Sequence, residues 1–203
     1  FLRAADIDGD GKTDLIVVNN LRAKIDILYN QTGATNRPAT QPGLRREINE
    51  LPPDARFRIE SVPSEKRIAS LVVADLNSDG RPDLAYYGEP KELIVQYNQG
   101  TNGWAAPKRW PIEDGILSDG ALSCGDLNGD GRPDLLLLAE KQIYFFAQTA
   151  SGDLGEPEKI PMSSFARGAQ AVDVNGDGRR DLLQVNWEST TPFRVRQQNA
   201  AGQ

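Results

Sequence analysis

The chain of 203 residues has no histidine, a single cysteine and no apolar run that approaches the length of a membrane span. Without histidine, the usual general base and the commonest transition-metal ligand are both missing. One cysteine, Cys124, excludes an internal disulfide and a cysteine-based zinc site. A membrane-spanning helix needs about 20 predominantly apolar residues in a row. We therefore expect no membrane span in this segment, and a chemistry that depends on carboxylates.

Positive charge is also scarce. The chain carries 23 Lys and Arg against 29 Asp and Glu, which gives a formal net charge of −6 and an isoelectric point near 4.8. Proteins that bind nucleic acid neutralise its phosphates with clustered basic residues. The acidic balance therefore predicts that nucleic acid is not a partner.

What the sequence does contain is one decapeptide in four copies, with the pattern Asp-x-Asp/Asn-x-Asp-Gly-x-x-Asp-Leu. We number its positions 1 to 10 and name the copies loop 1 (6–15), loop 2 (75–84), loop 3 (126–135) and loop 4 (173–182). Their starts lie 69, 51 and 47 residues apart. A period of this length is typical of a four-stranded β-propeller blade and is too long for most helical solenoids.

Short apolar or aromatic runs, bounded by turn residues, recur around each decapeptide and predict β-strands. Runs with small residues precede the loops and suit the innermost strand of a blade, at 2–5, 68–74, 121–125 and 168–172. Second strands follow the loops at 15–18, 84–87 and 135–138, and third strands are expected at 25–29, 93–97, 143–146 and 193–195. Polar edge strands are expected at 57–62, 108–112 and 158–161. The fold class is therefore all-β, built of four-stranded antiparallel propeller blades.

The repeats divide the single segment 1–203 into blades 1–66, 67–116 and 117–165 and a partial blade 166–203 without a fourth strand. An insertion at 31–56, which opens with a polar run rich in Gly and Pro, accounts for the long first interval. An open stack of blades would leave apolar faces in water. We therefore expect further blades, or a partner chain, to complete a larger ring.

The alternating acidic positions of the decapeptide predict a site for a hard divalent cation, which takes six to eight oxygen ligands. Oxygen ligands in this number favour Ca²⁺ over Mg²⁺. The expected ligands are the side chains at positions 1, 3, 5 and 9 and the backbone carbonyl at position 7: Asp6, Asp8, Asp10, Lys12 and Asp14; Asp75, Asn77, Asp79, Arg81 and Asp83; Asp126, Asn128, Asp130, Arg132 and Asp134; Asp173, Asn175, Asp177, Arg179 and Asp181. Loop 1, which alone has four Asp, is expected to bind calcium most tightly.

Two other interpretations of the decapeptide are less favoured. An EF-hand needs a bidentate Glu at position 12, where this chain has Val17, Tyr86, Leu137 and Gln184. A metal-free hairpin with Asx turns explains one Asp/Gly-rich bend. It does not explain four copies of converging carboxylates, which repel one another without a cation.

At these loops the chain resembles the FG-GAP/VCBS-type repeat family, whose members build seven-bladed propellers such as the integrin α-subunit head. The Phe-Gly and Gly-Ala-Pro signatures of the family are not recognisable, which indicates its bacterial VCBS-like branch. The resemblance covers nearly the whole chain. It implies up to four structural Ca²⁺ ions in the loops that join the first two strands of each blade. It also implies a secreted or cell-surface location, extracellular or periplasmic.

We expect a non-catalytic scaffold for adhesion or recognition, with a protein or glycan ligand at the cell surface. Two alternatives stay open, a carbohydrate-binding lectin and a polysaccharide lyase or hydrolase. Trp104, Trp110 and Trp187 are expected to pack against the protein rather than to stack on sugars. Cys124 is expected to pack in an inner strand. No pair of carboxylates outside the loops stands out as an acid and base, so we expect no enzymatic activity.

Overall fold

The computed structural model describes residues 1–33 and 55–199, which fold into antiparallel β-sheets with one short 3-10 turn, Gly100–Asn102. The chain forms two compact units, unit 1 (Phe1–Glu65) and unit 2 (Lys66–Gln203). Among the described residues, no helix is long and apolar enough to span a membrane. The predicted all-β class, built of propeller blades, is confirmed.

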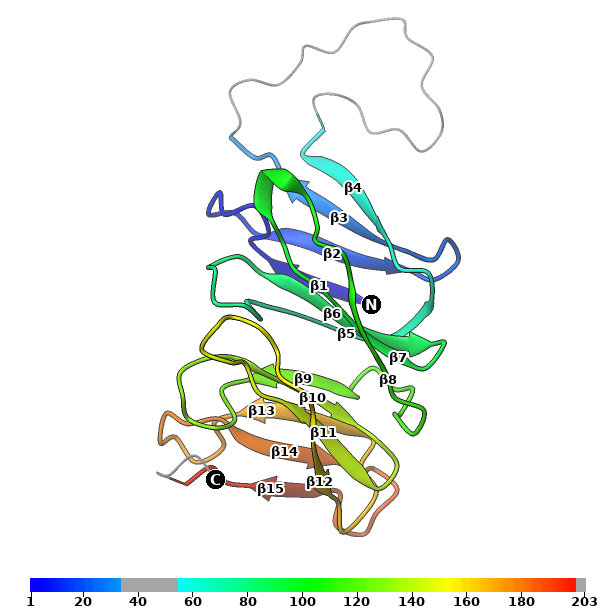
Figure 1. The fold of residues 1–203 in the computed structure, drawn as a ribbon, viewed down its shortest axis with the longest axis vertical. Helices are drawn as coiled ribbons and strands as arrows, with labels where there is room; N and C mark the ends of the chain where they lie inside the picture. Colours follow the sequence, from blue (N-terminus) through cyan, green and yellow to red (C-terminus); the bar gives the residue numbers. More distant parts are fainter. Residues whose placement is uncertain (34–54, 200–203) are drawn as a thin grey trace, which may run out of the picture. The chain divides into compact units, whose positions relative to one another are not determined.

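Unit 1 is one antiparallel sheet in the order β1-β2-β3-β4 (Figure 1). Its strands are β1 (Leu2–Ala5), β2 (Asp14–Asn19), β3 (Lys24–Asn30) and β4 (Phe57–Pro63). Residues of β3 alternate between buried and half-buried, as expected for a strand with two unlike faces. The expected insertion at 31–56 lies mostly outside the described residues. At its ends, the amide of Gln31 donates to the carbonyl of Arg56 at 2.8 Å.

Unit 2 contains three antiparallel sheets, and within each sheet the strands are hydrogen-bonded in the order in which they occur along the chain. The first sheet has β5 (Arg67–Ala74), β6 (Asp83–Glu89), β7 (Glu92–Gln96) and β8 (Lys108–Pro111). The second has β9 (Leu122–Gly125), β10 (Asp134–Leu138), β11 (Gln142–Phe146) and β12 (Glu158–Pro161). The third has only β13 (Gly168–Val172), β14 (Asp181–Val185) and β15 (Phe193–Arg196). These strands confirm the predicted ones.

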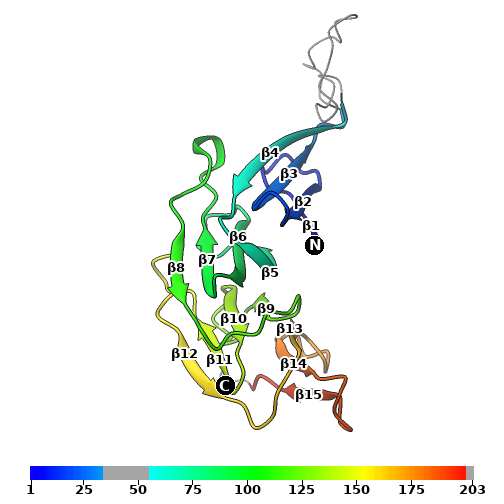
Figure 2. The same ribbon diagram turned by 90° about the vertical axis from the view of Figure 1, so that its right-hand side faces the viewer.

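The inner strands β5, β9 and β13 lie side by side, as Figure 2 also shows. Small side chains allow this approach and supply hydrogen bonds across it. The Ser70 hydroxyl donates to the Asp119 carbonyl at 2.7 Å and accepts the Leu122 amide at 3.1 Å. The Ser123 hydroxyl accepts the Ala171 amide at 2.9 Å. The inner strands of neighbouring sheets are therefore joined by polar contacts that large side chains would prevent.

The hydrophobic core of unit 2 lies between its sheets. All five residues of β10 are buried, and Leu135, Leu136 and Leu138 pack with side chains of the neighbouring sheets. At the edge strand β8, the Trp110 ring meets Phe146 edge-on, with ring centroids 5.4 Å apart. Strand β10, which is buried on both faces, requires a sheet on each side, and this explains its uninterrupted apolar run Leu135–Leu138.

Candidate metal centres

Each decapeptide connects the first strand of a sheet to the second, and its position 9 is the first residue of the second strand. In unit 2, loops 2, 3 and 4 lie at the same end of their sheets (Figure 1). The glycine at position 6 has a positive φ in all four loops, between 80° and 85°. This left-handed conformation is strained for other residues, which explains the invariant glycine within this chain.

The aspartate at position 1 organises the turn through backbone amides. In loop 3, Asp126 Oδ1 accepts the amides of Gly129 at 2.6 Å and Asp130 at 3.1 Å, and Oδ2 accepts that of Gly131 at 2.9 Å. Asp6 and Asp173 make the same three contacts in loops 1 and 4. The loop is therefore wrapped around this carboxylate, and its amides shape the turn.

The aspartate at position 9 is fully buried in every loop and holds the sheet together. In loop 3, Asp134 Oδ2 accepts the amide of position 2, Leu127, at 3.0 Å, and Oδ1 accepts the Gln148 amide beyond the third strand at 3.0 Å. The other three copies accept the equivalent pairs of amides at 2.7–3.1 Å. The sequence predicts a metal ligand at position 9. It does not reveal that the same aspartate also joins the loop to the end of the third strand through hydrogen bonds.

Burial perturbs two of these carboxyl groups. Desolvation raises the pKa of Asp83 and of Asp134 to about 6, although the accepted amide hydrogen bonds lower both values in part. The aspartates at positions 1 and 5 of the same loops raise them further. The buried carboxylate thus lies in a site where added positive charge is favourable.

Loop 1 brings three carboxylates together. Oxygens of Asp6, Asp8 and Asp14 all lie within 4.8 Å of one another. Two oxygens bound to one Ca²⁺ at about 2.3–2.6 Å are at most about 5 Å apart, so this group fits a single ion. Burial, followed by the charges of Asp14 and Asp10, raises the pKa of Asp8. The predicted ligands at positions 1, 3 and 9 of loop 1 therefore converge.

In loops 2, 3 and 4, position 3 is an asparagine that offers an amide oxygen instead. Asn128 Oδ1 accepts the Asp130 amide at 2.9 Å, and its Nδ2 donates to Asp130 Oδ2 at 3.2 Å. Asn77 and Asn175 make the same pair of contacts within their own loops. These loops keep the shape of loop 1 with one carboxylate fewer.

The carboxylate at position 5 lies against the basic side chain at position 7. These ion pairs are Asp10–Lys12, Asp79–Arg81, Asp130–Arg132 and Asp177–Arg179. The hydrogen bond from the Lys12 side chain lowers the pKa of Asp10, and the Arg179 amide lowers that of Asp177. Position 7 was predicted to contribute a carbonyl, and sequence reasoning missed its cationic side chain.

The position 7 arginines also fasten the loop to the chain beyond the third strand. Arg132 Nε donates to the Gln148 carbonyl at 3.2 Å, and Arg81 and Arg179 make the equivalent bonds to Asn98 and Gln198 at 2.9 and 3.2 Å. In three loops this cation therefore joins the position 5 carboxylate to the same segment that position 9 holds.

Two glutamines connect a loop to the next sheet. Gln148, almost fully buried, donates from Nε2 to the carbonyl of Asp75 in loop 2 at 3.1 Å, and its Oε1 accepts the Ser78 hydroxyl. Gln198 reaches Asp126 of loop 3 in the same way at 3.4 Å. Gln148 lies 14 residues after Asp134, whereas Gln198 lies 17 residues after Asp181, so no fixed spacing in the sequence identifies the two glutamines.

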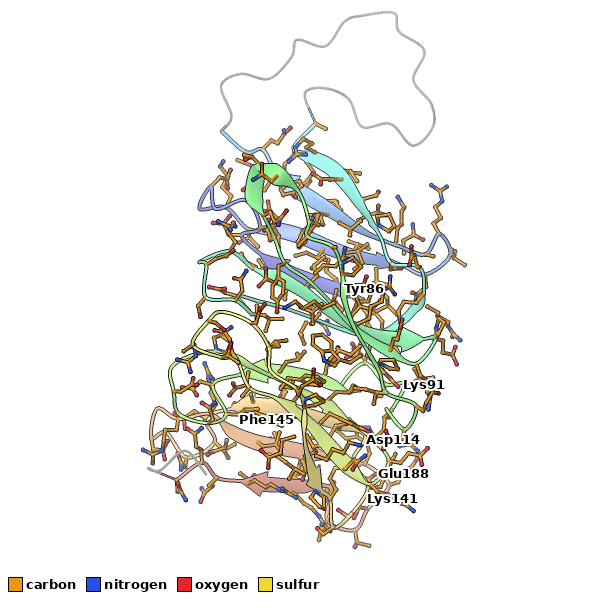
Figure 3. All side chains as sticks on the ribbon, in the orientation of Figure 1. Tyr86, Lys91, Asp114, Lys141, Phe145 and Glu188 are labelled. Carbon is orange, nitrogen blue, oxygen red and sulfur yellow. The ribbon has the colours of Figure 1, made fainter. Side chains whose placement is uncertain are left out.

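The remaining candidates have structural partners or exposed positions. Trp110 packs as predicted, whereas Trp187 is 71% exposed, so the packing prediction is wrong for this residue. Cys124 lies half-buried on β9. Asp114, labelled in Figure 3, accepts the Tyr144 hydroxyl at 2.7 Å and Gln142 Nε2 at 2.8 Å. Its carboxylate is thus engaged in holding β11.

The chain is similar in sequence to part of integrin alpha-7 and in fold to a fungal lectin. The chain is 32% identical over 151 residues to human integrin alpha-7 and 31% identical to the rat protein, an alignment that covers 63% of this chain and 13% of each relative. It therefore spans only a small part of those proteins. The solved structure of an Agrocybe aegerita lectin, which recognises non-reducing terminal N-acetylglucosamine, superposes with a TM-score of 0.51 at 17% identity, over 97% of this chain and 65% of the lectin.

The family comparison covers all four loops. The FG-GAP-like repeat matches residues 6–86, 75–137 and 126–183. The chain belongs to the FG-GAP-like repeat family.

Proposed function

We propose that this chain is a calcium-binding propeller module of a secreted or cell-surface protein, and that it serves as a non-catalytic scaffold for adhesion or recognition. The observation that carries the proposal is the convergence of Asp6, Asp8 and Asp14 within 4.8 Å, in a loop that recurs four times. The relationship to integrin alpha-7 supports adhesion and an extracellular location.

The donor chemistry supports calcium. Loop 1 offers carboxylate oxygens at positions 1, 3 and 9, and the other loops offer two carboxylates and an asparagine oxygen at these positions. A carboxylate oxygen that accepts a single amide, such as Oδ2 of the aspartates at positions 1 and 9, retains capacity for a second contact. Asp10 and its counterparts at position 5 can join the donor set once they release the basic side chain at position 7.

Calcium has a structural role in this proposal. The loops join the first strand to the second, and their ligands also hold the third strand and, through Gln148 and Gln198, the next sheet. At free calcium ten times Kd, each site adds about 1.4 kcal/mol of stability, and four sites add about 5–6 kcal/mol. This total is comparable with the stability of a typical domain.

Calorimetric titration of the full chain, after treatment with a chelator, tests the binding. We expect heat from up to four sites and a rise in melting temperature of about 10–20 °C. Asp8→Ala should remove the tightest site, whereas Glu60→Gln, which neutralises a surface acid on β4 of the same unit, should leave it intact. A melting temperature that neither calcium nor chelator changes would contradict the structural role.

The ligand of the scaffold is proposed to be a protein or glycan at the cell surface. Immunogold labelling or protease accessibility on intact cells tests the location, and protection of the chain inside cells would contradict it. Turnover of acidic polysaccharides by the purified chain would contradict the non-catalytic proposal and favour a lyase or hydrolase.

Carbohydrate binding is a second candidate, favoured by the exposure of Trp187 and by the fold shared with the Agrocybe aegerita lectin. An exposed indole ring offers a face on which a sugar can stack. Binding to N-acetylglucosamine that Trp187→Ala abolishes and Trp104→Ala preserves would support it. No binding to N-acetylglucosamine or to a glycan array would refute it.

A further inference from the structure

An open groove lies in unit 2, between loop 2 and a turn of the following sheet. Three stretches of chain line it: loop 2 itself, residues 97–105 between β7 and β8, and residues 152–153 in the connection from β11 to β12. Its volume of about 460 Å³ falls in the range of small-molecule sites in proteins. Most of this lining takes no part in the candidate metal ligands.

Contacts between the two sheets hold the walls of this groove in place. The Lys108 ammonium pairs with Asp153 Oδ1 at 2.6 Å, and the Tyr97 hydroxyl accepts the amide that follows Asp153 at 3.4 Å. Gly152 lies so close to loop 2 that a Cβ there would be 2.5 Å from the Asn77 carbonyl oxygen. The fold itself therefore forms the groove, and a ligand does not have to order it, which lowers the cost of binding.

Several polar groups that line the groove have unused hydrogen-bonding capacity. The side-chain amides of Gln99 and Asn102, both exposed, have no partner among the described residues. Tyr97 is only 8% exposed, and within the described part of the chain its hydroxyl accepts a hydrogen bond without donating one. Asp153 uses one carboxylate oxygen in its ion pair, so the other remains available. A buried hydroxyl without an acceptor favours a ligand, because an unmade hydrogen bond there is costly.

The charges that line the groove compensate one another. Arg81 pairs with Asp79, and Asp153 pairs with Lys108. The remaining capacity is a mixture of donors, on Arg81 and the two amides, and of acceptors, on the amides and Asp153. A sugar hydroxyl both donates and accepts, so neighbouring hydroxyls match this mixture, whereas a phosphate or sulfate supplies acceptors alone. The groove therefore favours a neutral, polyhydroxylated ligand over an anion.

We propose that this groove binds one or two units of a neutral saccharide through the amides of Gln99 and Asn102, the Tyr97 hydroxyl and the available oxygen of Asp153. The site is distinct from Trp187, which lies between β14 and β15. This inference deepens the recognition role proposed above and rests on it, but it does not require calcium, because protein contacts alone hold the groove.

A glycan array that carries neutral, sialylated and sulfated glycans tests the class of ligand. The full chain is applied in the presence of a chelator, which keeps the ion pair of Asp79 with Arg81 intact. We expect binding to neutral glycans, and weaker binding to their sulfated or sialylated forms. Calorimetric titration with the neutral glycan that the array selects then gives its affinity.

Substitutions in the short turn test the position of the site. Gln99→Ala and Asn102→Ala should each weaken glycan binding about three- to tenfold, and the double variant about 30-fold. The turn should persist in these variants, because backbone atoms make its hydrogen bonds: the Gln99 amide to the Gly103 carbonyl, and the Asn102 amide to the Gln99 carbonyl. An unchanged melting temperature of the double variant verifies this.

Two control variants complete the design. Gln170→Ala removes an exposed amide on β13 of the same unit and should leave the affinity for the glycan unchanged. Trp187→Ala should also leave it unchanged, because the indole is outside the groove. In nuclear magnetic resonance spectra, the glycan should shift the amide signals of residues 97–105 and 149–154.

Failure of this inference and failure of the calcium proposal are distinguishable. A chain that binds calcium but no neutral glycan would overturn the saccharide site and leave the calcium proposal standing. A chain that binds the glycan but no calcium would support the site and contradict the calcium proposal. A preference for sulfated glycans, full affinity in the double variant, or binding that Trp187→Ala abolishes would each overturn the saccharide site.

Discussion

Acidification is expected to stabilise unit 2 of the calcium-free chain between pH 7.5 and pH 5.0. Asp83 and Asp134 are fully buried, and burial raises their pKa to about 6, from 3.8 for an ordinary Asp. The folded state therefore takes up protons in a pH range where the unfolded state does not. Stability from these groups is fully present below pH 3.8 and is lost as the pH rises through about 6.

The size of the effect follows from these two values. Relative to pH 7.5, each carboxyl group adds about 1.4 kcal/mol to the free energy of unfolding at pH 5.0, and the two together add about 3 kcal/mol. The raised pKa of Asp8 acts in the same direction in unit 1. The lowered pKa values of Asp10 and Asp177 act below 3.8, outside this range.

Urea denaturation in the presence of a chelator measures the effect. All three tryptophans of the chain lie in unit 2, so their fluorescence reports on the unit that contains Asp83 and Asp134. The variants Asp83→Asn and Asp134→Asn cannot titrate at these positions, and each should lose about 1.4 kcal/mol of the pH dependence.

With calcium bound, the pH dependence of the free energy of unfolding should have the opposite sign. Ligands must be deprotonated to bind a cation, so acid releases the metal and the stabilisation by calcium decreases as the pH falls. A calcium-free chain that loses stability between pH 7.5 and pH 5.0, or a double Asn variant with the same pH dependence as the wild type, would refute this account of the buried carboxyl groups.

Three further predictions concern the loops and their supports. Asn128→Asp gives loop 3 the four aspartates of loop 1, so calorimetry should show one calcium site tightened about tenfold; unchanged affinities would contradict the charge argument. Gly152→Ala should lower the free energy of unfolding, measured by urea denaturation, by more than about 2 kcal/mol, because a Cβ there lies 2.5 Å from the Asn77 carbonyl oxygen. Gly103→Ala shares the positive φ but has open space around the added Cβ, so it should lower the free energy of unfolding by only about 1 kcal/mol. Equal losses for the two variants would show that the contact with Asn77 is unimportant. Gln148→Leu should cost about 1–3 kcal/mol, because it leaves the position 1 carbonyl of loop 2 without its buried donor, and an unchanged unfolding midpoint would contradict this.

Most of the fold could be predicted from the sequence because the decapeptide and its flanking apolar runs occur four times, so the strands expected around one copy can be checked against the other three. Apolar runs such as Leu135–Leu138 between turn residues identify strands locally, and the decapeptide fixes their order. The convergence of Asp6, Asp8 and Asp14 also followed from the local spacing, since these residues belong to one turn and its closing strand.

Features that depend on distant parts of the chain could not be predicted in this way. The carboxylate of Asp134 is held by the Gln148 amide, which lies 14 residues away on the far side of a hairpin. The exposure of Trp187 depends on which neighbours its turn meets, and composition alone does not give this. The ion pair of Asp10 with Lys12 is local, but the acidic motif predicts Asp10 as a metal ligand and gives no sign that Lys12 binds the same carboxylate.

The glutamine links make the array directional. Gln148 and Gln198 each reach back from one sheet to the loop of the sheet before it. The geometry of loops 2 and 3 is therefore completed by the repeat that follows each of them along the chain. If these loops bind the proposed cation, binding in one loop is expected to be coupled to the next repeat as a nearest-neighbour effect. Deleting or inserting a single repeat would consequently alter ion affinity in the upstream copy, while the downstream copy would keep its own support.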